Sequence, residues 1–411
     1  MRPPDYLYWL LSTVGACALA AIVFAVWVDP YRMYDTAPVH GWTELKPRSY
    51  EQAEIAKTYQ LERIKPETLL LGNSRIEVGF DPDSLLWPPT ARPVFNAALA
   101  GRDLQSAVDM LMDSIAVHPP RTVIVGLDFL DFLHKPDTAP WPVPVRHAEE
   151  RRLLVDDDGN FNPDRRLQVL RDRLSTTLTI DALTDSFDTL LDQDAATSVT
   201  MTPNGFDPLH EYQLFVRRSG YHELFAEKND AYQRDYPALP KPDFADPLAF
   251  ANSRYLVKLI SLARRDHIRL VLLIHPYHAD FLDVLRRAKL WSSFENWKRA
   301  MVKVRDDAAG ADAADIPLYD FSGSNRFSTE PVPPADDRKT EMRWYWEPGH
   351  YKSALGDEML RVIIDGDTSF GRLLTSDTIE NVLAEIRTAQ ACSVRGRQAS
   401  NATSCAAAGS E

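Results

Sequence analysis

Tyr6 to Val28 is a run of 23 residues without a charged side chain. As an α-helix it reaches about 34 Å at ~1.5 Å per residue, enough to cross a hydrocarbon core of roughly 30 Å. Tyr8 and Trp9 lie near one end and Trp27 near the other, as interfacial aromatic residues do. The run predicts one N-terminal transmembrane helix, which leaves the remainder of the chain to fold outside the lipid.

A cleaved signal peptide is the alternative, because Ala18-Leu19-Ala20 offers small residues of the cleavage type. The apolar run continues unbroken to Val28, which is longer than the apolar region of a signal peptide and favours an uncleaved anchor. Basic residues on both sides of the run give only a weak orientation bias. A tail of residues 1–5 is most simply left in the cytoplasm, which places the residues after Val28 on the other side.

The charge and the cysteine content exclude several kinds of protein. The chain of 411 residues has 46 Lys and Arg against 59 Asp and Glu, and the net charge is −13. This acidity argues against nucleic acid as a partner, because phosphates need clustered basic side chains. Three cysteines exclude a disulfide-stapled scaffold, and no Cys-x-x-Cys is available for a zinc site. No metal or other cofactor is expected. Cys392 and Cys405 either pair in an oxidising compartment or stay free thiols.

Short apolar strands alternate with helical patterns over residues 65–365. Gly101 to His118, for example, has apolar residues at three- and four-residue spacing and predicts a helix. This alternation predicts an α/β domain with a parallel sheet and helices on both faces. The predicted strands are Thr68–Leu71, Pro93–Phe95, Thr122–Gly126, Arg269–Ile274 and Pro317–Tyr319.

Three segments lie outside this alternation. Residues 29–64 form a connector with a short helix from Glu51 to Ile64. Residues 134–245 show a helical pattern around Arg165 to Leu191 and are interpreted as a mostly helical insertion. Residues 366–411 form a C-terminal extension, and its composition predicts a flexible tail from about residue 387.

The first segment with a candidate catalytic residue is Leu71-Gly72-Asn73-Ser74-Arg75. A buried strand ends at the glycine, so Ser74 is expected at the carboxyl end of a parallel strand, where open α/β sheets bind their ligands. If a helix begins there, its free amides favour an oxyanion beside the serine. The alternative is an ordinary turn with a capping serine.

The second segment is Glu347-Pro348-Gly349-His350. A carboxylate three residues before a histidine, in a turn broken by Pro-Gly, can hold the imidazole and its orienting partner together. Such a loop presents His350 as a general base to a serine, with Glu347 fixing the tautomer of the ring. The alternative is a solvated turn before the helix that follows.

Together the two segments resemble the SGNH (GDSL-like) hydrolase superfamily, which has a Gly-Asp-Ser motif after its first strand and an Asp-x-x-His motif at the end of the domain. Asn96-Ala97-Ala98-Leu99-Ala100-Gly101 resembles the second block, whose glycine amide contributes to the oxyanion hole, and Val125-Gly126-Leu127-Asp128 stands in the place of the third. The resemblance covers residues 65–365 without the insertion. It implies a three-layer, flavodoxin-like α/β fold and a catalytic triad of Ser74, His350 and Glu347.

Five further residues are candidates for the oxyanion hole or the substrate cleft. The resemblance implies an oxyanion role for the Gly101 amide and places Asn96 in the second block. Arg75 follows the serine and would make the cleft locally basic, and Tyr277 follows the strand Arg269–Ile274 at a carboxyl edge. Asp128 is the remaining candidate.

Three residues depart from the family pattern. Asn73 replaces an Asp that is not the nucleophile, and Glu347 replaces the triad Asp with a longer carboxylate. Asp128 replaces an Asn that donates to the oxyanion, and an ionised Asp only accepts hydrogen bonds. Losing one such donor costs about 100- to 1000-fold in rate. Either the Ser74 and Gly101 amides suffice, or Asp128 is protonated or has another role.

A single membrane anchor before an SGNH-like domain resembles the bacterial envelope proteins of alginate acetylation and teichoic-acid D-alanylation. This resemblance implies a periplasmic domain on the bacterial cytoplasmic membrane, a multi-span acyl-donor protein as partner and an exported polysaccharide as acceptor. The first hypothesis is therefore an O-acyltransferase that works through an acyl-serine. The alternatives are a carbohydrate esterase or deacetylase with the same site, and a non-catalytic polysaccharide-binding or assembly protein.

Overall fold

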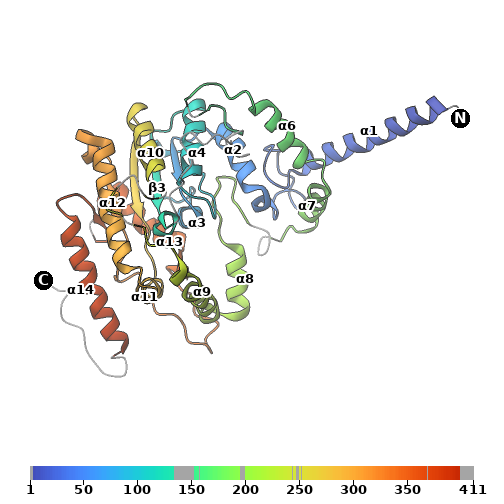
Figure 1. Cartoon of the computed structure of the whole chain (residues 1–411). Helices are drawn as coiled ribbons and strands as arrows, with labels where there is room; N and C mark the ends of the chain where they lie inside the picture. Colours follow the sequence, from blue (N-terminus) through green and yellow to red (C-terminus); the bar gives the residue numbers. More distant parts are fainter. Residues whose placement is uncertain are drawn as a thin grey trace.

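The fold is a layered α/β domain from which one long helix projects (Figure 1). The computed structural model describes residues 3–133, 152–156, 158–194, 200–242, 244–246, 250, 252–367 and 369–398. Six strands form the central sheet in the order β2-β1-β3-β4-β5-β8. They are β1 (Thr68–Leu71), β2 (Val94–Asn96), β3 (Thr122–Leu127), β4 (Arg269–Ile274), β5 (Leu318–Asp320) and β8 (Arg372–Leu373).

The first five strands are parallel, as the sequence predicts, and their order is that of doubly wound sheets. The expectation of a wholly parallel sheet is wrong at one edge, where β8 pairs with β5 in the antiparallel direction. β8 consists of Arg372 and Leu373, both exposed, so it has no apolar pattern by which a strand could be recognised. The sheet is therefore mixed but mostly parallel.

Alternate residues of the strands supply two cores, one on each face of the sheet. Leu69 and Val123 face a core formed with α4 (Leu104–Val117), α10 (Ser253–Arg265) and α12 (Trp291–Ala309). Leu70 and Ile124 face the other core, formed with α3 (Ser74–Gly79) and α13 (Ser353–Asp365). Strands that are buried on both faces are necessarily apolar throughout, which explains the Leu and Val runs in the sequence.

The projecting helix α1 (Pro3–Val28) is the predicted anchor. An 18-residue window within its segment Asp5–Val28 has a mean hydropathy of 2.2, and only 11% of that window is buried, so the helix is long and apolar enough to span a membrane. The last turn differs from the rest because Ala25 and Val28 are fully buried in the domain. The anchor and the domain are thus joined by packing as well as by the chain.

Within residues 134–245, the described residues include the α-helices α6 (Arg165–Ser175), α7 (Ile180–Leu191), α8 (His210–Ser219) and α9 (Tyr221–Asp235). α6 and α7 lie near the base of α1, whereas α8 and α9 lie near the edge of the domain that carries α11 (Ala279–Arg287) (Figure 1). The helix in the connector before the sheet is α2 (Ala53–Ile64), two residues shorter than expected.

The C-terminal extension corrects one expectation. α14 (Ile379–Gln398) continues well past residue 387, where the sequence suggested a flexible tail. Leu383 and Ile386 are buried against the domain, and Arg387 pairs with Glu295 of α12 at 2.5 Å, so the first half of α14 is held by tertiary contacts. Alanines after that point are good helix formers and prolong it. The side chain of Cys392 and all of Cys405 lie outside the described residues, as does their proposed pairing.

Candidate active site

Ser74 lies in the turn that leaves β1. Gly72 has φ +145°, and a Cβ there would lie 2.9 Å from the Ile76 side chain, so the turn requires glycine. The Asn73 side chain accepts a hydrogen bond from the amide of Arg75 at 3.1 Å and caps α3. Ser74 is therefore the first residue of α3, and its own amide has no partner inside that helix.

His350 and Glu347 belong to the two strands of a small hairpin, β6 (Tyr345–Glu347) and β7 (His350–Tyr351). The Nε2 atom of His350 lies 2.8 Å from the Ser74 Oγ atom. The Nδ1 atom of the same ring is hydrogen-bonded to the Glu347 carboxylate. The structure thus brings together the three residues expected to form a triad, in the order serine, histidine, carboxylate.

The Glu347 carboxylate is fully buried and has three hydrogen-bond donors. Besides His350, the Gly349 amide donates to it at 2.8 Å and the Tyr232 hydroxyl donates at 3.0 Å. Burial alone would raise the pKa of Glu347, but the charge and hydrogen bond of His350, the Gly349 amide and the Arg75 charge outweigh it and lower that pKa. The carboxylate is therefore ionised and able to stabilise an imidazolium.

Two contacts fix the hairpin against the serine turn. Nε of Arg75 donates to the Gly349 carbonyl at 2.8 Å, which joins α3 directly to the loop of His350. α13, which follows β7, crosses α3 at a pair of glycines: a Cβ on Gly356 would lie 1.8 Å from the Gly79 carbonyl oxygen. The distance between Ser74 and His350 therefore depends on a close helix contact as well as on their own hydrogen bond.

Asp128 has a role other than donating to an oxyanion. It is almost fully buried and forms an ion pair with Arg75. Its carboxylate also accepts from the Asn73 side-chain amide at 2.8 Å and from the Tyr277 hydroxyl at 3.2 Å. Asn73 and Asp128 thus contact each other, and this contact ties the serine turn to the end of β3.

Three residues expected at the substrate cleft are instead part of its support. Arg75 is buried, with its guanidinium against the ring of Tyr277 at 5.2 Å, so it cannot make the cleft basic. Tyr277 is fully buried and stacks on Phe281 at a centroid distance of 4.7 Å. Asn96 is also fully buried, and its amide donates to carbonyls of α3 and to the Phe80 carbonyl. All three side chains are therefore buried beneath the site and are not exposed to a substrate.

Gly101 is exposed and has φ +70° in the loop after β2. It lines a cavity of about 320 Å³ together with Leu99, Arg102 and Asp131. Ser74 and His350 do not line this cavity, which adjoins their site through Asp131, a hydrogen-bond acceptor from Asn73 at 3.2 Å. The oxyanion role of Gly101 stays a prediction.

Sequence reasoning missed Tyr232 and Asp131. Tyr232 comes from α9, in the segment interpreted as an insertion, and no motif marks it. Tyr212 of α8 also reaches the site, with its ring edge-on to His350 at 6.3 Å. Burial raises the pKa of Asp131 to about 7, and the positive charge of Arg75 opposes this only in part. Its position three residues after Asp128 was the only available signal.

The arrangement suits nucleophilic acyl chemistry. Ser74 has a base at hydrogen-bond distance, and the base has a buried carboxylate on its other nitrogen. Among the described residues, no three His, Cys, Asp or Glu side chains lie close enough together to hold a metal ion. No protein-family model matches the chain, and no curated protein matches it at a significant level.

Proposed function

We propose that the protein is a membrane-anchored serine O-acyltransferase that moves an acyl group, most simply acetyl, to hydroxyls of an exported polysaccharide. The observation that carries the proposal is the Ser74–His350–Glu347 alignment, with 2.8 Å between Oγ and Nε2 and the carboxylate on Nδ1. The order of the motifs is that of the SGNH hydrolases. The N-terminal apolar helix, which is long enough to span a membrane, supports the membrane anchoring. Placement on the cytoplasmic membrane with the domain on the periplasmic side is part of the proposal and follows the resemblance alone.

In the first half-reaction Ser74 Oγ attacks the carbonyl carbon of an activated acyl ester or thioester, and its proton passes to Nε2 of His350. The leaving group takes that proton as its bond to the carbonyl carbon breaks, which leaves an acyl-serine. In the second half-reaction a sugar hydroxyl attacks the acyl-serine and gives its proton to His350. Collapse returns this proton to Ser74 Oγ and releases the esterified sugar.

The negative charge that develops on the carbonyl oxygen needs hydrogen-bond donors. The Ser74 amide at the start of α3 and the Gly101 amide are the proposed donors. Asp128 does not take this role, because its carboxylate is an acceptor that is occupied by Arg75, Asn73 and Tyr277. A site with two donors is expected to react more slowly than a three-donor hydrolase.

The decisive experiment uses the full chain in detergent or vesicles with a chromogenic acetyl ester, with and without oligosaccharide acceptors. Wild type and Ser74→Ala are compared, and a fluorophosphonate probe reports the nucleophile independently. Acetylated sugar from wild type alone supports acyl transfer. Ester hydrolysis at a rate that does not change when the oligosaccharide acceptor is added supports the carbohydrate esterase instead.

A non-catalytic assembly protein predicts a different outcome. In that case neither the ester nor the fluorophosphonate reacts with wild type. Ser74→Ala is folded and gives the same result as wild type in both assays. The catalytic proposal would then be withdrawn, because a serine with an aligned base and a buried carboxylate should at least be labelled.

A further inference from the structure

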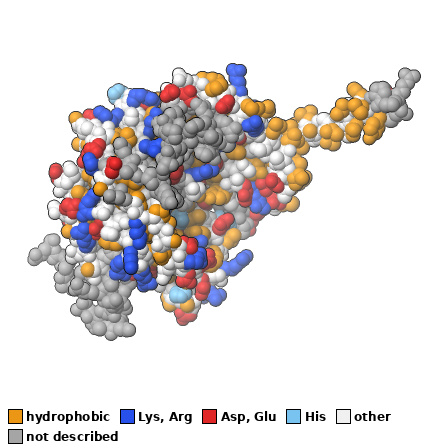
Figure 2. All heavy atoms as spheres, viewed as in Figure 1, with side chains coloured by type: hydrophobic (Ala, Val, Ile, Leu, Met, Phe, Trp, Pro, Cys, Tyr) orange, Lys and Arg blue, Asp and Glu red, His pale blue; other side chains and the backbone are white. Residues whose placement is uncertain are grey.

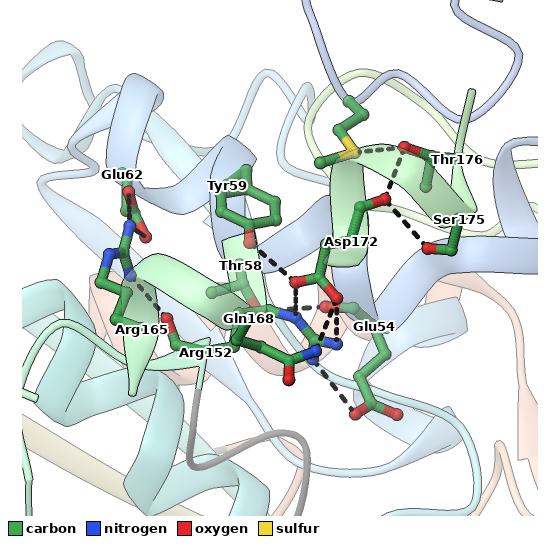
Figure 3. A network of polar contacts seen from close by, with 11 residues as sticks. Glu54, Thr58, Tyr59, Glu62, Arg152, Arg165, Gln168, Asp172, Ser175 and Thr176 are labelled. Carbon is green, nitrogen blue, oxygen red and sulfur yellow. Dashed lines mark hydrogen bonds and ion pairs between the residues drawn. The ribbon is translucent and has the colours of Figure 1, made fainter. Parts of the chain in front are cut away.

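α6 buries polar residues and exposes apolar ones, which is the reverse of an ordinary surface helix. Its buried residues are polar, namely Gln168 and Asp172, followed by Thr176 just after the helix. Asp172 accepts hydrogen bonds from Tyr59 of α2 at 2.7 Å and from Arg152 at 2.7 Å (Figure 3). These contacts fix which face of α6 points inward, because a buried carboxylate cannot give up such donors cheaply.

The opposite face of α6 is apolar and exposed. Positions 167, 170 and 174 fall on one side of a helix with about 3.6 residues per turn, and Leu178 follows in the short connection to α7. All four are leucines that are 42–53% exposed. Single exposed leucines are ordinary on a soluble protein, but a continuous stripe on a helix with a polar interior is not. An apolar environment outside the domain would stabilise this stripe by removing the leucines from water.

α7 repeats the arrangement. Its buried residues are small or polar (Ala182, Ser186 and Thr189), whereas Ile180 and Leu191 are 83% and 84% exposed. Phe187, on the same side as Ile180 and Leu191, lies 4.9 Å from Phe24 of α1 between ring centroids. We define the apolar face as Leu167, Leu170, Leu174, Leu178, Ile180, Phe187 and Leu191.

The apolar face lies beside α1, and this position indicates that lipid covers it. α7 packs against α1, and Phe187 of the apolar face contacts Phe24 in the C-terminal part of that helix. Hydrophobic side chains gather where α1 meets the domain (Figure 2). Arg166 and Arg173 lie on one flank of the leucine stripe and Arg171 on the other, and all three are exposed. Basic side chains beside an apolar stripe are typical of helices that lie in the headgroup region of a bilayer.

We propose that α6 and α7 lie in the membrane interface, with the apolar face among the lipid acyl chains beside α1. This inference rests on the proposed membrane anchoring and is independent of the proposed acyl transfer. It gives the protein two membrane contacts, a span and an interfacial helix pair, which together set the orientation of the domain. The polar contacts between α6 and α2 then transmit that orientation to the rest of the fold (Figure 3).

The test places single cysteines in the full chain, with Cys392 and Cys405 changed to Ser. Native Cys17, exposed in the middle of α1, reports the anchor by itself. Leu170→Cys and Leu191→Cys, each combined with Cys17→Ser, report the apolar face. Leu373→Cys in β8 is the matched control, because it is an exposed leucine at the far edge of the sheet. Each variant is labelled with an environment-sensitive fluorophore and reconstituted into vesicles of phosphatidylethanolamine and phosphatidylglycerol.

Labels at 170 and 191 are expected to show blue-shifted emission and quenching by nitroxide lipids, and little quenching by aqueous iodide. The label at 373 should show the reverse. If the Cys17 label is quenched by nitroxide lipids but the labels at 170 and 191 respond to iodide, the interfacial helices are refuted while the anchor stands. If the Cys17 label also responds to iodide, the anchoring itself fails.

Two further outcomes overturn lipid as the occupant. Protection at 170 and 191 that disappears when the protein is diluted with excess lipid indicates a second copy of this chain. Protection in native membranes but not in pure vesicles indicates another membrane protein. Circular dichroism and the thermal midpoint of each cysteine variant verify the fold, and substitution of these exposed leucines is expected to change both little.

Discussion

At the scale of single residues, the geometry of the site depends on buried side chains around Ser74, His350 and Glu347. The sequence pattern was sufficient to pair Ser74 with His350 and Glu347, because their motifs occur in order and at the ends of strands. It could not separate residues that line the cleft from residues that support it. Arg75 and Tyr277 follow strands as ligand-binding residues do, yet both are buried and are engaged by Asp128.

Tyr232→Phe is expected to slow the reaction of Ser74 with a fluorophosphonate by about fivefold. Burial and the Glu347 charge raise the pKa of Tyr232, so its phenol keeps its proton and donates to the carboxylate at 3.0 Å. Losing one such bond costs about 1 kcal/mol. Tyr236→Phe is the control, since Tyr236 stacks on Tyr232 at 5.1 Å without a hydrogen bond to Glu347. Equal rates for the two variants would remove Tyr232 from the positioning of the triad.

Asp207 supplies a pH dependence of stability away from the triad. Burial, and then the charge of Glu77, raise its pKa from 3.8 to about 7. The folded state therefore binds more protons than the unfolded state between these values, so the contribution of Asp207 to stability is full below pH 3.8 and is lost as the pH rises through about 7.

Asp207→Asn stays neutral and can still accept the Leu209 amide, which lies 2.7 Å from Oδ1. Relative to wild type, the variant should gain stability as the pH rises from 4 to 8, by at most about 4 kcal/mol. Thermal midpoints in detergent across this range give the measurement. A difference between the two proteins that does not change with pH would contradict the raised pKa.

At the scale of elements, the five parallel strands were predictable and the antiparallel edge strand β8 was not. β1, β3 and β4 are buried on both faces, so their sequences are continuous apolar runs. β8 has two exposed residues and joins the sheet only because the chain returns to β5 after α13. The first half of α14 is held by tertiary contacts such as Arg387 with Glu295, which no local pattern reports.

Gly356→Ala is expected to separate α13 from α3. The new Cβ would lie 1.8 Å from the Gly79 carbonyl oxygen, so the helices must move apart. Overpacking of this kind costs roughly 1–3 kcal/mol, and here it also displaces the hairpin of His350 from Ser74. The fluorophosphonate reaction should therefore fall more than the thermal midpoint alone explains. Asp365→Ala, at an exposed position of the same helix, should change neither measurement, and normal labelling of Gly356→Ala would refute the coupling.

At the scale of the whole molecule, the anchor is an extension of the domain. Ala25 and Val28 are fully buried, the Asp29 amide donates to the Ala25 carbonyl at 2.8 Å, and Lys46 Nζ donates to the Val28 carbonyl. A helix long and apolar enough to span a membrane was predictable from composition, whereas this junction was not, because an apolar residue in the sequence looks the same whether it faces lipid or protein. A rigid junction is also what two membrane contacts on one domain require.

A truncated chain that begins at Phe24 retains this junction, and one that begins at Asp29 lacks it. Burial of a valine contributes roughly 1.5–3 kcal/mol, so the shorter chain should have a free energy of unfolding that is lower by about 2 kcal/mol. Denaturant titration of both soluble chains measures the difference. A third chain that begins at Leu19 adds residues that are mostly not buried in the domain, and should match the chain that begins at Phe24. If all three chains unfold at the same denaturant concentration, the last turn of α1 belongs to the membrane span alone, and the domain is tethered by the chain rather than held in one orientation.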